Sequence, residues 1–219
     1  MHDAIKNHWI VHPVLPPHPI SIRALKPKGS LLDLQPQNIN YYINKYASLD
    51  RLKEHFEHEA LCLNQAGYNV YTVMNLIRDD LPMRKAVQDV DIVARTTLLI
   101  DIDRVGDTNN PATDLEVAAA FRLAEEVEAY LASMGFPKPF WVHSGNGAHL
   151  YYKIDPAIEQ KSTAGIDLFL KGLAKRFNND VVGVDTTVHN PSRITKVIGT
   201  LARKGVEAAD RPFRVARLL

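Results

Sequence analysis

An apolar run that ends in two carboxylates constrains this chain more than any other feature. Residues 96–103 read TTLLIDID, and β-branched and aliphatic residues in such a run are typical of a buried strand. Side chains two positions apart share one face of a strand, so Asp101 and Asp103 point the same way while Ile102 turns into the core. Two neighbouring carboxylates repel each other unless something neutralises them. The stretch therefore predicts a rigid strand that ends in a polar site.

Two explanations of the carboxylate pair are open on these residues alone. Mg²⁺ or Mn²⁺, which prefer oxygen ligands, would neutralise the pair. Alternatively, the strand passes into a polar loop and Arg104 pairs with one carboxylate. A third carboxylate favours metal, because three of them from two strand ends can hold two ions for phosphoryl or nucleotidyl transfer. Asp185, which follows the apolar run 181–184, could fill that place. On sequence alone it has these rivals: Asp107, Asp114, Asp155 and Asp180.

The composition limits the class of protein. The 219 residues carry a net charge of +1, which excludes capture of nucleic acid by bulk charge but allows a local basic groove. The single cysteine, Cys62, excludes an internal disulfide and a cysteine-rich zinc site, so no zinc is expected. Its apolar helical surroundings predict a core position. No apolar run reaches the roughly 18 residues of a membrane span, and no secretory leader is evident, so a cytoplasmic location is expected.

Helical and strand-like patterns alternate along the chain, which predicts an α/β (α+β) fold. The segment before residue 36 is expected to be irregular apart from a strand at 20–25. The predicted helices cover 36–66, ended by Gly67, then 113–134, opened by a Thr113–Glu116 capping box, and 163–177. The predicted strands cover 68–74, 96–103, 140–143, 148–154, 181–185 and 194–198, with 77–95 a loop or short helix. The hairpin at 140–154 favours a mixed or antiparallel sheet over a doubly wound one.

The most specific stretch is HSGNGAHLYY at 143–152, whose turn holds Ser144, Gly145, Asn146 and Gly147. Glycines allow the backbone to approach a ligand closely, and the amides of such a turn can form an anion-binding concavity. His149 follows on the return strand and could hydrogen-bond a phosphate oxygen. The alternative is an ordinary glycine-rich turn with His149 on a solvated face. His143 is expected to be a plain strand residue.

Basic residues follow in NPSRITKVIGT at 190–200. Arg193 suits bidentate contact with phosphate, and Lys196 would act as a point charge. Positions three apart on a strand face opposite sides, so both reach one ligand only if the backbone is irregular there. The alternative is a pair of surface bases. Arg203 and Lys204 come next and would extend a positive groove.

Taken in order, these motifs resemble those of the archaeo-eukaryotic primase superfamily, and more narrowly the primase-polymerase (prim-pol) domains of plasmids, phages and mobile elements. LLIDID matches an hhhDhD strand, and SGNGAH matches an S-G-x-G-x-H pattern. VVGVD matches a third motif centred on an Asp after an apolar strand, and RITKVIGT matches a later R-I-x-K-x-x-G-T block. The N-terminal ISIRAL and YNVYTVMN also resemble the small lobe that precedes these motifs, so the resemblance covers nearly the whole chain.

The resemblance implies a fold of two parts, with an N-terminal α/β module at 1–95 packed against an RRM-like catalytic sheet at 96–219. It implies that Asp101, Asp103 and Asp185 bind the catalytic Mg²⁺ or Mn²⁺ ions and that His149 joins them in catalysis. It further implies that the incoming nucleotide is bound by Ser144, Gly145, Asn146, Gly147, His149, Arg193 and Lys196. The chain lacks the cysteine-rich zinc element of some relatives and stops soon after the last motif.

The expected activity is template-directed DNA primase or polymerase chemistry, with (d)NTPs transferred to a primer or initiating nucleotide. The expected partners are a single-stranded DNA template, the primer and a helicase or accessory domain that this chain does not contain. Two alternatives stay open. A non-catalytic RRM-like module would bind nucleic acid through aromatic residues on its sheet. A metal-dependent phosphohydrolase would use the same carboxylates without a triphosphate pocket.

Overall fold

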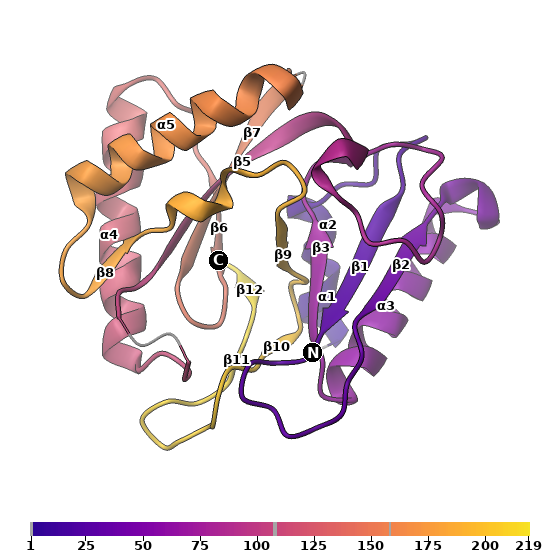
Figure 1. The fold of residues 1–219 in the computed structure, drawn as a ribbon, viewed down its shortest axis with the longest axis horizontal. Helices are drawn as coiled ribbons and strands as arrows, with labels where there is room; N and C mark the ends of the chain where they lie inside the picture. Colours follow the sequence, from indigo (N-terminus) through magenta and orange to yellow (C-terminus); the bar gives the residue numbers. More distant parts are fainter. Residues whose placement is uncertain (1, 107–108, 158) are drawn as a thin grey trace.

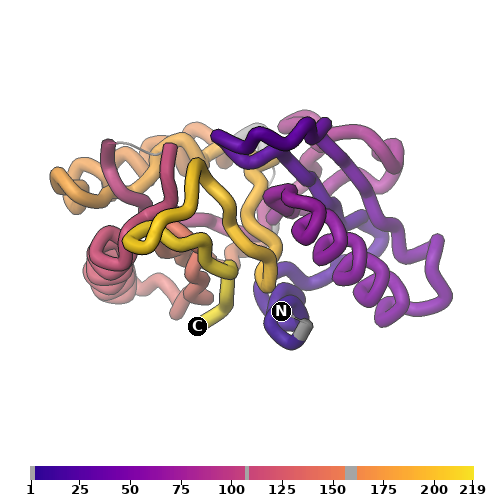
Figure 2. The backbone as a smooth tube through the Cα atoms, turned by 90° about the horizontal axis from the view of Figure 1, so that it is seen from below, coloured from indigo at the N-terminus to yellow at the C-terminus, as the bar shows by residue number. Residues whose placement is uncertain are grey.

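The computed structural model describes residues 2–106, 109–157 and 159–219 of the chain. Two larger antiparallel sheets lie side by side, with α3 (Leu49–Gln65) against the first sheet and α4 (Asp114–Ser133) and α5 (Glu159–Phe177) against the second (Figure 1). A third, two-stranded sheet is formed by β10 (Leu201–Ala202) and β11 (Arg214–Val215). The C-terminal segments from β9 onward run between these two halves, as Figure 2 shows from below. Among the described residues, no helix combines the length and the apolarity that crossing a bilayer requires.

The first sheet has the strand order β2-β1-β3-β9. Its elements are β1 (Ile20–Leu25), β2 (Gln37–Tyr41), β3 (Asn69–Val73), β9 (Ile194–Lys196) and the covering helix α3 (Leu49–Gln65). Short helices α1 (His2–Lys6) and α2 (His8–Val11) precede it, and η1 (Ile43–Lys45) links β2 to α3. Leu52 and Phe56 of α3 pack on Ile22 and Val70 of the strands. The division at residue 95 stays a prediction, and β9 brings a C-terminal segment into this N-terminal sheet.

The second sheet has the strand order β12-β6-β7-β5-β4, with β8 paired to the far end of β5. Its strands are β4 (Leu76–Ile77), β5 (Ile92–Arg104), β6 (Phe140–His143), β7 (Ala148–Ala157), β8 (Val182–Val184) and β12 (Arg217–Leu218). The remaining elements are η2 (Asp89–Asp91), α4 (Asp114–Ser133), α5 (Glu159–Phe177), η3 (Thr186–His189), β10 (Leu201–Ala202) and β11 (Arg214–Val215). The predicted α+β class, the 140–154 hairpin and the capping box of α4 are confirmed.

Two sequence predictions about the N-terminal half are wrong. Residues 37–41 form a strand rather than helix, because Ile39 and Tyr41 alternate into the core while the backbone pairs with β1. The helix begins only after Ser48, whose side chain accepts a hydrogen bond from the amide of Arg51. The segment before residue 13, expected to be irregular, contains α1 and α2, which are held by burial of Ile5 and other apolar side chains.

Two local predictions also need correction. Cys62 is exposed rather than in the core, because it lies two positions after the buried Ala60 and therefore on another side of α3. The strand predicted at 96–103 starts earlier, at Ile92, where the residues expected to be loop pair with β4.

Candidate active site

A cleft of about 420 Å³ lies between the two sheets. Its walls combine charged side chains from both halves: Lys26, Lys28, Asp101, Asp103, His149, Arg193, Lys196, Arg203 and Lys204. Ser144 and Asn146 also line it, from the turn between β6 and β7. Nine of the residues singled out in the sequence thus share one cleft, and they come from three separate stretches of the chain.

The carboxylate pair sits at the far end of β5, on the face predicted from the two-residue spacing. Ile102 between them is fully buried, as expected. Asp101 lies opposite His149 in the β5–β7 register, and its Oδ1 is 3.3 Å from His149 Nε2. The alternative in which Arg104 neutralises a member of the pair is wrong, because Arg104 is buried against Glu116, 3.2 Å away, and donates to the carbonyl of Pro111.

The pKa values of the two carboxyl groups shift in opposite directions. Burial and the negative charge of Asp101 together raise the pKa of Asp103 to about 6. Burial also tends to raise the pKa of Asp101, but the interactions with His149 and the charges of Arg193 and Lys204 together outweigh it and lower that pKa. Burial tends to lower the pKa of His149, and the interactions with Asp101 and Asp103 together reverse this and raise it. The charge of Asp101 is therefore stabilised, whereas at Asp103 the charges of Lys204, His149 and Arg104 only partly offset burial and repulsion.

The pair fits a divalent cation. Among the described residues, Asp101 Oδ1 and Asp103 Oδ1 are both buried without a hydrogen-bond partner, and both residues line the cleft, so carboxylate oxygens are left for a cation to satisfy. Asp185 ends β8, and its amide donates to the carbonyl of Asp101 at 2.8 Å. Its carboxylate accepts from the amide of Thr187 and shares a neighbouring depression of about 360 Å³ with Asp103. No three His, Cys, Asp or Glu side chains in the described ranges stand close enough together to hold a metal ion.

The backbone amides of the hairpin turn donate hydrogen bonds to side chains of the hairpin itself. The amides of Asn146 and Gly147 donate to Ser144 Oγ at 3.3 and 3.0 Å, and that of Gly145 donates to His143 Nδ1 at 2.9 Å. The anion-binding role of these amides stays a prediction, and in this structure each amide already has a partner within the hairpin. His143 is therefore more than a plain strand residue, since its ring supports the turn.

The glycines of the turn are needed for packing against the protein itself. A Cβ on Gly147 would lie 2.2 Å from the carbonyl oxygen of Ile102, and one on Gly145 would lie 2.4 Å from Ala202 Cβ. Of the two, Gly145 alone has a positive φ, of 102°. The Asn146 side chain accepts a hydrogen bond from the amide of Ala112 at 2.9 Å. The turn is thus pressed against the end of β5, which places it beside the carboxylates.

The basic side chains of the 190–200 stretch both reach the cleft. Arg193 precedes β9, so the strand alternation that separates positions three apart does not apply to it. The Lys196 ammonium lies 4.3 Å from the centre of the Tyr71 ring, and burial lowers the pKa of Lys196 well below its ordinary value. In the part of the chain that the structure describes, Lys196 Nζ and Arg193 Nε are buried and have no hydrogen-bond partner.

Sequence reasoning missed the wall that the first sheet supplies. Lys26 and Lys28 follow β1, and Tyr71 lies on β3, all more than twenty residues before the carboxylates. Their sequence pattern is that of an ordinary turn and strand, so nothing local marks them. Lys204, expected only to extend a positive groove, lines both the cleft and the depression beside Asp185.

No family model matches the sequence, and no curated protein is significantly similar to it. Solved structures do match. The archaeo-eukaryotic primase domain of the cyanophage S-2L primase-polymerase superposes with a TM-score of 0.57 at 17% identity, over 100% of this chain and 89% of that one. Primase RepB′ superposes with a TM-score of 0.52 at 12% identity, over 99% of this chain and 55% of that one. The fold is that of a primase-polymerase domain. The prim-pol resemblance of the motifs is thereby confirmed at the level of fold.

Proposed function

We propose that this chain is a template-directed nucleotidyltransferase that makes or extends primers on single-stranded DNA from (d)NTPs. One observation carries the proposal. On a prim-pol fold, the cleft places the carboxylates of Asp101 and Asp103 against a wall of basic side chains. Phosphotransfer chemistry needs this combination, because carboxylates hold divalent cations and basic groups bind the phosphates.

Each side chain has a role in this proposal. Asp101 and Asp103 would hold Mg²⁺ or Mn²⁺. Asp185, whose carboxylate lies in the neighbouring depression with Asp103, would have to move closer to join them as the third ligand. Such ions supply positive charge that neutralises phosphate oxygens and lowers the pKa of an attacking hydroxyl. Arg193 and Lys196 would bind the triphosphate; Arg193 Nε and Lys196 Nζ are buried without a hydrogen-bond partner among the described residues, while Arg193 also donates to the carbonyl of Thr187.

The hairpin residues would act together. His149 would orient Asp101 and donate to a phosphate oxygen. Ser144, with Gly145 and Gly147, would keep the turn in the shape that brings His149 and the cleft wall together. Positive groups arranged before substrate arrives stabilise the charge that develops on the leaving pyrophosphate without a cost of reorganisation.

The two alternative functions differ in what they leave unexplained. A non-catalytic nucleic-acid-binding module would have no use for two buried carboxylates, which repel phosphate in the absence of a cation. A metal-dependent phosphohydrolase would use the carboxylates but would leave Lys196 Nζ and Arg193 Nε, which have no hydrogen-bond partner among the described residues, without a triphosphate to bind.

An extension assay tests the proposal. The protein is incubated with primed or unprimed single-stranded DNA, with NTPs or dNTPs, and with Mg²⁺ or Mn²⁺. We expect nucleotide incorporation that needs the metal, is lost in Asp103→Asn and is kept in Asp180→Asn, since Asp180 is exposed outside the cleft. Release of phosphate without incorporation would identify a phosphohydrolase. Binding of DNA with neither reaction would identify a binding module.

A further inference from the structure

Tyr151 stands directly behind His149 on the same face of β7. Its hydroxyl oxygen is 3.0 Å from His149 Nδ1, and the whole side chain is buried, with 1% of its surface exposed. Burial raises the pKa of Tyr151, so the phenol keeps its proton. A buried neutral phenol beside an imidazole nitrogen acts as a hydrogen-bond donor to that nitrogen or an acceptor from it.

The other ring nitrogen of His149 decides between these two possibilities. His149 Nε2 lies 3.3 Å from the carboxylate oxygen of Asp101. A neutral imidazole that carried its proton on Nδ1 would turn a bare lone pair toward that carboxylate, which is unfavourable. With the proton on Nε2, both contacts are favourable, because Nε2–H faces Asp101 and Nδ1 accepts from the Tyr151 hydroxyl.

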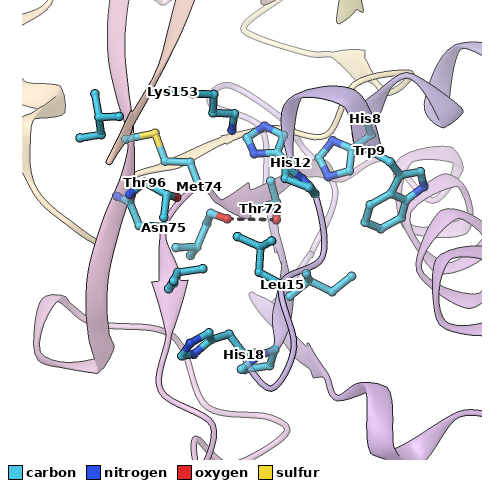
Figure 3. A pocket seen from close by; sticks show the side chains of 16 residues that line it. His8, Trp9, His12, Leu15, His18, Thr72, Met74, Asn75, Thr96 and Lys153 are labelled. Atoms are coloured by element: carbon cyan, nitrogen blue, oxygen red, sulfur yellow. Dashed lines mark hydrogen bonds between the residues drawn. The ribbon is translucent and has the colours of Figure 1, made fainter. Parts of the chain in front are cut away.

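The surroundings of Tyr151 hold its ring in place. The His12 ring packs edge-on against it, with centroids 5.5 Å apart, and His12 Nε2 is 3.5 Å from Thr195 Oγ1. His12 also lines a second cavity of about 240 Å³, where it lies near Lys153 and His8 (Figure 3). Lys153 in turn donates to the carbonyl of Val11 at 2.5 Å. The residue that follows α2, His12, therefore packs against the tyrosine ring and restricts its movement.

We propose that Tyr151 is a positioning residue for His149. The carboxylate of Asp101 favours the Nε2–H tautomer, and the Tyr151 hydroxyl donates to Nδ1 and holds the ring so that Nε2 stays directed at Asp101 and the cleft. The link to nucleotide binding rests on the proposed function, but the hydrogen bond to Nδ1 does not. Tyr151 does not line the cleft itself; its hydroxyl contacts two residues that do, His149 and Thr195.

The neighbouring Tyr152 provides a matched control. It is equally buried on the same strand, but its side chain faces the opposite side of the sheet, where its ring meets Phe136. Its hydroxyl has no hydrogen-bond partner among the described residues. Tyr151→Phe and Tyr152→Phe therefore delete the same atom from adjacent residues, and only the first deletion removes a contact to His149.

The test combines nitrogen-15 NMR of the histidine rings with steady-state kinetics. Spectra are recorded without metal, at a pH where titration of the same resonances shows the imidazole to be neutral. We expect His149 to be the Nε2–H tautomer in all three proteins, because Asp101 faces Nε2 in each. The Nδ1 resonance of His149 should be the same in the wild type and in Tyr152→Phe and should shift in Tyr151→Phe, which loses the hydrogen bond to Nδ1. We expect Tyr151→Phe to raise the KM for the nucleotide roughly 3- to 10-fold, the range of one hydrogen bond.

Three results would overturn the proposal. They are an Nδ1–H tautomer in the wild type, an unchanged Nδ1 resonance in Tyr151→Phe, and a shifted resonance with an unchanged KM. If the wild type incorporates no nucleotide at all, the proposed function fails, and the NMR comparison still decides whether Tyr151 donates to Nδ1. Dispersed amide spectra of both variants show that they fold.

Discussion

The two faces of the second sheet carry opposite kinds of side chain, although they alternate along the same strands. The face toward α4 and α5 is apolar and fully packed, with residues such as Leu98, Ile100, Ile102, Leu150 and Tyr152. The face toward the cleft carries Asp101, Asp103, His149 and Tyr151 instead. Burying like charges and unpartnered polar atoms costs stability, and the packed face offsets that cost while holding the backbone rigid. A binding site can therefore contain polar groups without hydrogen-bond partners if the opposite face of the same strands is packed in an apolar core.

The largest expected effect is on folding, and it comes from placing a carboxylate on the packed face of the sheet. Ile102→Asp would put a carboxylate at a fully buried position surrounded by the apolar core. An unpaired buried charge costs several kcal/mol, a large share of the roughly 5–15 kcal/mol that stabilises a domain. We expect no cooperative thermal transition by circular dichroism. The control Ile102→Val should lose only about 1 kcal/mol, and a wild-type melting curve for Ile102→Asp would mean that the two faces do not differ.

The next largest effect is a loss of activity without a loss of stability, caused by a substitution on the cleft face. Asp101→Asn keeps the shape of the side chain and an oxygen that can accept from His149 Nε2. We expect the free energy of unfolding to stay within about 1 kcal/mol of wild type. Primer extension should fall about 100-fold or more, the equivalent of roughly 3 kcal/mol of lost charge stabilisation. Unfolding of this variant would mean that the carboxylate is structural, and unchanged extension would remove it from the metal site.

The smallest expected effect is on the pH dependence of stability, and it comes from His143 at the end of β6, where the turn begins. Burial lowers its pKa from 6.5 to about 4. The unfolded chain thus takes up a proton at this position before the folded protein does, so the stability present above pH 6.5 is lost as the pH falls toward 4. The full loss is about 3 kcal/mol at most.

His143→Asn isolates this contribution, because an amide oxygen can still accept from the amide of Gly145 but does not titrate. Denaturant unfolding of both proteins at pH 7 and pH 4.5 gives the measurement. We expect the stability difference between wild type and variant to shift in favour of the variant at the lower pH. Parallel pH curves would show that His143 is not held neutral by burial.

Local patterns predicted the parts of the fold that local forces decide. The hairpin around 144–147, the cap at Thr113 and the inward turn of Ile102 follow from steric and hydrogen-bonding rules within a few residues. Residues 37–41 were mispredicted as helix because their apolar spacing fits either a helix or a strand. They form a strand because they pair with the edge of β1. The partner of Arg104 could not be predicted locally, because Glu116 lies at the start of α4 and only the fold brings it to Arg104.

The sequence by itself determined that Asp101 and Asp103 share one face of a strand and that a glycine-rich turn and a histidine follow on the next hairpin. Alternation along a strand is a property of the backbone and needs no tertiary information. Only the tertiary structure decided that Lys26, Tyr71 and Lys196 close the cleft from the other sheet, and that Tyr151 backs His149. Those contacts join residues far apart in the chain, and they form because the apolar surface of two sheets must be buried at once.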